Sequence, residues 1–168
     1  ILLGIAIAIK ASSPGPAFYA HRRIGKDGIY FNCYKFRSMV VDSDRRLQEY
    51  LRANPEAAKE WEETHKLKHD PRVTKIGAFL RKTSLDELPQ LFNVIRGQMS
   101  LVGPRPIVDE EVIKYDVFFS DYTMVRPGMT GLWQTSGRSD TSYSRRVRLD
   151  AWYVRNWNIW LDISLLVK

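Results

Sequence analysis

The sequence is poor in the residue types that build cross-linked and zinc-binding proteins. Only one of its 168 residues, Cys33, is a cysteine, so no intramolecular disulfide and no cysteine-rich metal site can form. The three histidines, His21, His65 and His69, lack the paired spacing of a zinc-binding helix, and we interpret them as ordinary surface or core residues. A reducing compartment is compatible with this composition.

The apolar stretch at residues 1–9 is too short to cross a bilayer, because a spanning helix needs about 20 apolar residues. No cleavage-site pattern follows it, so the sequence does not predict a signal peptide. A buried strand or core helix is the plain alternative, since a short apolar run does not reveal its period. Two prolines and a glycine in Ser12–Pro16 end any regular element that enters from this stretch.

Acidic residues are outnumbered by basic ones. There are 26 Lys and Arg against 19 Asp and Glu, which gives a net charge of +7. This excess favours anionic partners: nucleic acid, phosphorylated metabolites or an anionic membrane surface. The length suits one domain with a real core and is short for two, so we expect a single domain.

Local patterns predict a mainly helical α+β domain with a small β-hairpin. The turn at Lys26–Gly28 separates two segments rich in aromatic and β-forming residues, which indicates the hairpin. Helix formers with alternating charge then predict a solvated helical pair interrupted near Pro55. We expect further helices within 70–84, from 85 before an extended loop that ends at 106, and over 108–122, then an irregular glycine-rich loop at 126–140.

The last segment predicts one amphipathic helix from Leu149 to Leu165. Three of the five tryptophans, Trp152, Trp157 and Trp160, lie on its apolar face. A helix packed into the core explains this face. Tryptophan beside basic residues also suits a membrane interface, and the apolar start of the chain adds weight to that interpretation.

The stretch Arg81–Leu91 contains two adjacent carboxylates, Asp86 and Glu87. Ser84 followed by Glu87 fits a capping box, in which both acids would serve only the helix. Near the positive end of the helix dipole a carboxylate gains about 0.3–1 kcal/mol. Pro89 conflicts with this, because with Ser84 as cap its missing N–H falls where a helical hydrogen bond is due. Either the helix starts later or its first turn is distorted, and such local conflicts tend to mark functional sites.

Basic residues surround this pair, among them Arg81, Lys82 and Arg96, and Arg105 lies on a stiff loop between two prolines. Arginines bind phosphate oxygens bidentately. Two acids in a basic setting suit chemistry on a phosphate, since one carboxylate can attack phosphorus and carboxylate oxygens also ligate Mg²⁺. A diphosphate that approaches a carboxylate is repelled, and each pair of unit charges at 4 Å costs roughly 4 kcal/mol at an effective dielectric of 20. Positive charge would therefore be needed close to the pair.

Three blocks resemble the bacterial sugar transferases, the monotopic polyprenyl-phosphate phosphoglycosyl transferases. They are KFRSM at 35–39, DPRVTKIGAFLRKTSLDELPQLFNVIRGQMSLVGPRP at 70–106 and RPGMTGLWQTSGR at 126–138. The segment between the first two is similar to the longer, hexose-transferring members, especially undecaprenyl-phosphate galactose phosphotransferases. The resemblance implies transfer of a hexose 1-phosphate, with galactose favoured over glucose, from UDP-sugar to undecaprenyl phosphate with release of UMP. That reaction begins exopolysaccharide, capsule or O-antigen synthesis at the cytoplasmic face of the bacterial inner membrane.

The resemblance also implies roles for individual residues. Asp86 would be the nucleophile that takes the phosphosugar covalently, and Glu87 would help with Mg²⁺, the implied cofactor, and with protons. The implied phosphate-binding residues are Lys35, Arg37, Arg81, Arg105, Arg126 and Arg138. Further active-site candidates are Gln90, Pro104, Pro106, Gln134 and Asp150.

The family's fold implies a re-entrant membrane helix, of which residues 1–13 would be only the returning half. Residues 14–168 would form the catalytic domain, with amphipathic helices at the membrane interface. The absence of a starting methionine suggests a fragment cut within a longer apolar segment. Besides UDP-sugar and undecaprenyl phosphate, the expected partners are inner-membrane lipids, and a homodimer is compatible with the sequence.

Two other functions remain open at this point. A basic module that binds a membrane or nucleic acid would need no catalysis, although the aromatics are not interleaved with basic residues, which disfavours nucleic acid. A metal-dependent phosphohydrolase would release free sugar phosphate without a lipid. Lipid dependence of product formation separates this last function from a transferase.

Overall fold

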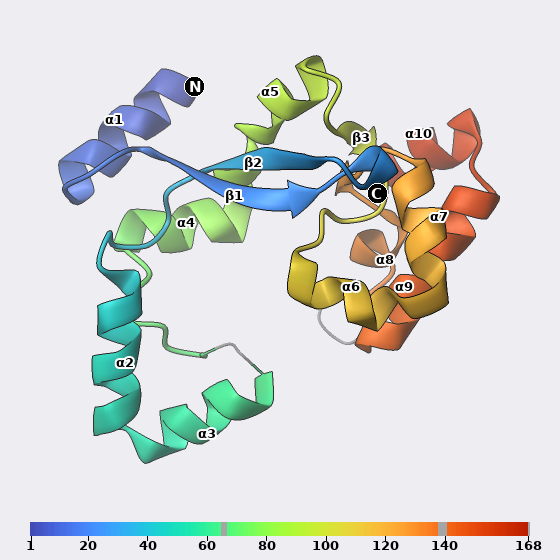
Figure 1. Ribbon diagram of the computed structural model, residues 1–168. Coiled ribbons are helices and arrows are strands. Elements are labelled where there is room, and N and C mark those ends of the chain that lie inside the picture. Colours follow the sequence, from blue (N-terminus) through green and yellow to red (C-terminus); the bar gives the residue numbers. More distant parts are fainter. Residues whose placement is uncertain (65–66, 138–140, 168) are drawn as a thin grey trace. The chain divides into compact units, whose positions relative to one another are not determined.

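The structure is a computed structural model that describes residues 1–64, 67–137 and 141–167 (Figure 1). These residues form two compact units. The first contains residues 1–19 and 35–88, and the second contains 20–34 and 89–168. The chain is mainly helical with one small hairpin, as the sequence predicts.

The hairpin consists of β1 (Phe18–Ile24) and β2 (Tyr30–Phe36). They are joined by the short 3-10 helix η1 (Lys26–Gly28), which confirms the turn predicted there. Asp27 in this turn has a positive φ of 57°, a conformation that aspartate tolerates better than most residues. Both strands contribute residues to both units, so the chain passes between the units within this hairpin.

The first unit contains α1 (Leu2–Ser12), α2 (Ser43–Ala53), α3 (Pro55–Thr64), α4 (Lys75–Thr83) and the 3-10 helix η2 (Leu85–Glu87). Helices α2 and α3 meet at Pro55, as expected for the interrupted helical pair (Figure 1). A cluster of Ile9, Ala17, Phe36 and Leu80 forms the core. It ties α1 and α4 to the end of β2.

Helix α1 buries one of its faces against that cluster through Leu2, Ile5, Ala6 and Ile9. Leu3 and Ile7 lie elsewhere on the helix and stay 74% and 60% exposed. Within the described residues, no helix has the length and apolar character needed to cross a bilayer. The re-entrant membrane helix therefore stays a prediction.

Helix α4 has well-defined ends. The Thr74 side chain accepts a hydrogen bond from the Gly77 N–H and so caps the first turn. A Cβ atom at Gly77 would lie 1.9 Å from the Ser38 carbonyl oxygen, so only glycine lets α4 pack this closely on the chain after β2. The helix ends at Ser84, whose φ of 58° is left-handed.

The second unit contains α5 (Gln90–Ile95), α6 (Asp109–Tyr115), the 3-10 helix η3 (Asp116–Phe118), α7 (Phe119–Met124), α8 (Leu132–Thr135), α9 (Tyr143–Arg155) and α10 (Ile159–Val167). It also contains β3 (Ser100–Val102) and β4 (Gly128–Thr130), which pair in parallel with Ser100 opposite Gly128. The sequence pattern missed this pair, because three-residue strands carry too little alternation to be recognised.

Two predicted helices were wrong in extent. The helix expected over 108–122 is broken at Asp116, whose φ is 47°, into α6, η3 and α7. The single helix expected from Leu149 to Leu165 is two helices, because the chain leaves the helical path between Arg155 and Ile159. The break separates the tryptophans: Trp152 lies on α9, Trp160 on α10 and Trp157 between them.

Candidate active site

The adjacent carboxylates Asp86 and Glu87 lie in η2, directly after α4. The predicted capping box is wrong: Ser84 makes no side-chain cap hydrogen bond and instead ends α4. The Ser84 N–H, which the Glu87 side chain would accept from in a capping box, donates instead to the Arg81 carbonyl at 3.3 Å, so the Glu87 side chain takes no part in capping. The acids therefore lie in a tight turn between two helices.

Pro89 explains the conflict seen in the sequence. Helix α5 begins at Gln90, with Pro89 as the residue before it, so the missing N–H of proline costs no helical hydrogen bond. The first of the two explanations, a helix that starts later, is confirmed. Because the helix is delayed, Asp86 and Glu87 lie in the turn that precedes it.

Glu87 is held by a lysine from the hairpin. Lys35 Nζ donates to Glu87 Oε1 at 2.5 Å, and both side chains are about one-third exposed. The bond joins β2 to η2 within the first unit. Lys35 is thereby fixed beside the carboxylate pair, although the two residues are 52 positions apart.

Asp86 is half-buried and its charge is only partly compensated. Burial raises the pKa of the Asp86 carboxyl, and the negative charge of Glu87 raises it further. The positive charges of Lys35 and, to a smaller extent, Arg81 lower it. The net pKa lies above the ordinary aspartate value. A carboxylate of raised pKa is more basic, and so a stronger nucleophile when ionised, than a carboxylate whose pKa is strongly lowered by ion pairs.

Two arginines of the first unit differ in their surroundings. Arg81, from the last turn of α4, donates from Nε to Ser38 Oγ at 2.8 Å and is exposed. Arg37 is only 8% exposed, and its terminal nitrogens donate to the carbonyl oxygens of Ser13 and Pro14. Arg81 is thus available to a ligand, whereas Arg37 holds the turn after α1.

The second unit carries a separate network around Arg105. Arg105 contacts Glu111 at 3.3 Å, and Arg23 lies 3.6 Å from the same carboxylate. Asp150 is 2% exposed and accepts a hydrogen bond from the Tyr115 hydroxyl at 2.8 Å. Burial raises the pKa of Asp150 to about 7, against the opposing effects of that hydrogen bond and of the Arg105 charge.

The remaining predicted site residues are dispersed in the second unit. Gln90, Pro104 and Pro106 are buried, and the Pro106 carbonyl accepts from Arg23. Arg126 is exposed, Gln134 donates weakly to the Met129 carbonyl at 3.5 Å, and Arg138 lies outside the described residues. Sequence reasoning missed Ser38 and Glu111, which orient two of the predicted arginines; Ser38 stood inside the quoted KFRSM block.

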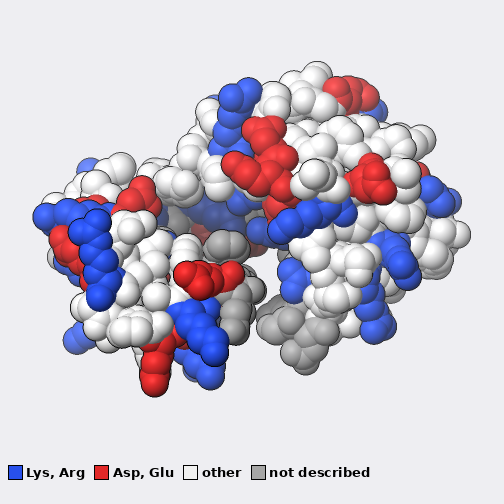
Figure 2. Space-filling model, turned by 60° about the horizontal axis from the view of Figure 1, so that its bottom comes forward, with Lys and Arg blue, Asp and Glu red and all other residues white. Residues whose placement is uncertain are grey.

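The charges on the surface are mixed. On the face drawn in Figure 2, basic side chains lie next to acidic ones. This face therefore offers local basic sites, of the kind that suit small anions.

The carboxylate pair is compatible with a magnesium ion. Mg²⁺ usually takes one or two carboxylates and completes its shell with substrate phosphates and water. Asp86 and Glu87 are adjacent in η2 and can supply those carboxylates, and among the described residues no cluster of three or more His, Cys, Asp or Glu offers an all-protein site. Such an ion would depend on a phosphate-bearing ligand.

The half-buried carboxylate pair therefore has a lysine and an arginine beside it, an arrangement that suits phosphate-bearing ligands. A family model described as bacterial sugar transferase matches residues 1–168, and the chain belongs to that family.

Three relatives indicate how the family members are named. The undecaprenyl-phosphate galactose phosphotransferase of Salmonella typhimurium is 58% identical over 154 residues, which cover 92% of this chain and 32% of the relative. The exopolysaccharide production protein ExoY of Rhizobium meliloti is 52% identical over 168 residues, 100% of this chain and 74% of the relative. The UDP-glucose:undecaprenyl-phosphate glucose-1-phosphate transferase of Escherichia coli is 40% identical over 175 residues, 99% of this chain and 34% of the relative. The chain spans about a third of the length of the curated relatives that match it at 56–58% identity.

Proposed function

We propose that the chain is the catalytic part of a phosphoglycosyl transferase that moves a hexose 1-phosphate from UDP-sugar to undecaprenyl phosphate and releases UMP. The observation that carries this proposal is the half-buried Asp86 beside the Lys35–Glu87 pair. The names of the relatives supply the substrate class. Galactose is favoured, because the relative named for galactose is 58% identical and the one named for glucose 40%.

The reaction would take two steps. An Asp86 carboxylate oxygen attacks the sugar-bearing phosphorus, the bond to the bridging oxygen breaks, and UMP leaves with that oxygen. A phosphate oxygen of undecaprenyl phosphate then attacks the same phosphorus, which frees the carboxylate and forms undecaprenyl diphosphate sugar. The covalent aspartyl-phosphosugar intermediate lets a soluble donor and a membrane-held acceptor react in turn at one carboxylate.

The neighbouring residues would each support the attack. Lys35 keeps part of the Asp86 population ionised by lowering its pKa against the effect of burial. Arg81 would bind phosphate oxygens and offset charge that builds up on them. Mg²⁺, held by Asp86 and Glu87 together with the diphosphate, would neutralise charge on the donor. Arg105 and Arg126 are proposed as further phosphate contacts.

We propose that the enzyme acts at the cytoplasmic face of the inner membrane. Support comes from exposed apolar side chains of α1, with Leu3 at 74% and Ile7 at 60%, and from Ile1 just before it at 95%. Trp160 on α10 is 75% exposed, and tryptophan is enriched at membrane interfaces. Lipid contact at these side chains would bring the enzyme to its acceptor.

The test measures UMP release by the full chain with Mg²⁺ and either UDP-galactose or UDP-glucose, with and without undecaprenyl phosphate. We expect at most one equivalent of UMP without lipid, turnover with lipid, and a hexose-phosphate adduct on Asp86 in the intact mass. Asp86→Asn should abolish adduct and turnover, whereas Asp44→Asn, an exposed aspartate of α2, should keep both. Full UMP release by Asp86→Asn would refute the covalent step. Lipid-independent turnover would indicate a phosphohydrolase.

A further inference from the structure

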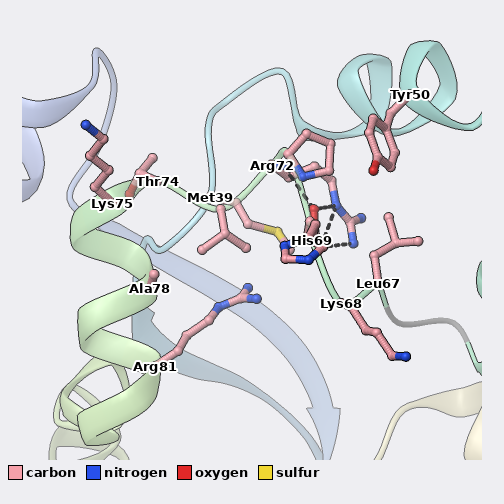
Figure 3. Close-up of a pocket in the computed structure, with 13 residues that line it drawn as sticks. Met39, Tyr50, Leu67, Lys68, His69, Arg72, Thr74, Lys75, Ala78 and Arg81 are labelled. Atoms are coloured by element: carbon pink, nitrogen blue, oxygen red, sulfur yellow. Dashed lines mark hydrogen bonds and ion pairs between the residues drawn. The ribbon is translucent and has the colours of Figure 1, made fainter. Parts of the chain in front are cut away.

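The first unit contains a cavity whose lining residues do not include Asp86 or Glu87. It lies among α2, α4 and the loop at 67–73, and its volume is about 940 Å³ (Figure 3). Sites for small ligands usually measure about 300–1,000 Å³. Tyr50 enters it from α2, and Arg81 enters it from α4 on the opposite side.

The lining of the cavity is strongly basic. Four basic residues, Lys68, Arg72, Lys75 and Arg81, and one acidic residue, Asp70, line it, although the Lys75 side chain points away from the other labelled residues (Figure 3). Arg72 compensates that carboxylate, with bonds of 2.8 Å from Nε and 2.7 Å from a terminal nitrogen. In the described part of the chain, the amino group of Lys68 enters no ion pair, nor does the guanidinium of Arg81. An anion would therefore meet uncompensated positive charge.

Arg81 connects this cavity with the carboxylate pair. Burial by itself would raise the pKa of Asp70. The hydrogen bonds from Arg72 and the charges of Arg72 and Arg81 lower it more, so the net pKa lies below the ordinary aspartate value. The Arg81 guanidinium also lowers the pKa of Asp86 against burial. Arg81 lines the cavity from the last turn of α4, and η2 with the proposed nucleophile Asp86 follows this helix directly, so the cavity and the carboxylate pair adjoin at this end of α4.

The lining also indicates the kind of anion. Tyr50 is half-buried and, with Met39, presents aromatic and thioether surface to the cavity. Such surfaces pack against a planar base, while Arg81 and Lys68 suit a diphosphate. An isoprenoid chain would require a continuous apolar lining, which polar or charged side chains interrupt at Lys68, His69, Asp70 and Arg72.

We propose that this cavity binds the nucleoside diphosphate part of the donor, with the diphosphate toward Arg81 and the base toward Tyr50. In that orientation the sugar-bearing phosphorus lies at the end of the ligand that is nearest to Asp86. The inference rests on the proposed function for the identity of the donor. It adds the segment that carries Tyr50 and Lys68 to the substrate-binding residues.

The test titrates UDP and inorganic pyrophosphate into the full chain and its variants by calorimetry. Tyr50→Ala should raise the Kd for UDP on the order of tenfold, the effect of losing one aromatic–base contact, and leave the Kd for pyrophosphate unchanged. Lys68→Ala should raise both by about threefold to fivefold. This lysine is exposed, and its backbone N–H bond to Glu60 does not involve the side chain, so the variant should fold. Arg52→Ala, an exposed cation of α2 outside the cavity, is the matched control and should change neither.

Steady-state kinetics separate this inference from the proposed function. Tyr50→Ala and Lys68→Ala should raise the KM for UDP-sugar and leave kcat close to the wild-type value. Turnover by both variants with wild-type KM and wild-type UDP affinity would overturn the cavity assignment and leave the transferase intact. UDP binding that is weakened by both variants, in a chain that turns over no UDP-sugar, would support the cavity and refute the transferase.

Discussion

Lys35 Nζ and Glu87 Oε1 lie 2.5 Å apart, and this bond places a lysine of the hairpin beside the carboxylate pair. Lys35 is also the strongest of the charges that counter the burial of Asp86. Its contact with Glu87 thus orders the cation that keeps the neighbouring aspartate ionised.

Replacing Lys35 should therefore change the pH dependence of the reaction. In Lys35→Met the pKa of Asp86 should rise further, because burial and the Glu87 charge then act with less opposition. A larger protonated fraction at low pH means that kcat/KM for UMP release should fall more on the acidic side of the profile than at high pH, so its acidic limb should move to higher pH. The pH–rate profiles of wild type, Lys35→Met and the exposed control Lys59→Met provide the measurement. An unchanged acidic limb in Lys35→Met would contradict this role.

Gly77→Ala should destabilise the first unit severely. The new methyl group would lie 1.9 Å from the backbone oxygen of Ser38, and backbone cannot rotate away as a side chain can. We expect the free energy of unfolding to fall by more than about 3 kcal/mol in urea denaturation. Gly4→Ala is the matched control: a Cβ at Gly4 in α1 meets no atom within 4 Å, so stability should stay equal or rise by up to about 1 kcal/mol. A mild effect at Gly77 would mean that α4 packs less closely on Ser38.

Arg105→Ala should reduce activity far more than stability. The Arg105 side chain is 41% exposed, and a surface ion pair of this kind contributes about 0–1 kcal/mol. Glu111→Ala should cost about 1–3 kcal/mol, because Glu111 also accepts from the Tyr143 hydroxyl and the Val108 N–H. Urea denaturation and UMP release, measured on both variants, separate the two roles. Equal losses of stability and activity in Arg105→Ala would assign this arginine to the fold.

Asp150 should make stability depend on pH. Its folded pKa is about 7 and its ordinary value 3.8, so between these pH values the folded chain keeps a proton that the unfolded chain has lost. This contribution to stability is present in full below about pH 4 and is lost as pH rises toward 7, at about 1.4 kcal/mol per unit. Asp150→Asn cannot titrate, so its free energy of unfolding should fall less steeply over this range. Parallel curves for wild type and variant would contradict the raised pKa.

Tryptophan fluorescence should report contact with lipid. Trp157 and Trp160 are 55% and 75% exposed, so they have room to enter an interface. Liposomes that contain anionic lipid should shift their emission to shorter wavelength, and the shift should weaken in Trp160→Ser. The buried Trp133, 9% exposed, is the internal control, since Trp133→Phe should leave the shift intact. Emission that does not respond to liposomes would exclude membrane contact by these side chains.

The sequence by itself determined the features that depend on neighbours along the chain. The turn at Lys26–Gly28, the helical pair broken at Pro55 and the misfit of Pro89 follow from the backbone preferences of single residues, and the structure confirms them. The family blocks are likewise a matter of residue order, and the match over residues 1–168 confirms the family.

Only the tertiary structure decided the features that join distant residues. The Lys35–Glu87 bond and the Arg81–Ser38 bond link residues 52 and 43 positions apart, and no local pattern encodes such pairs. The capping box failed because Ser84 ends one helix instead of starting the next, a choice made by the packing of α4. The parallel pairing of β3 and β4 and the cavity between Tyr50 and Arg81 also arise from contacts across the chain, whose free energy outweighs weak local preference.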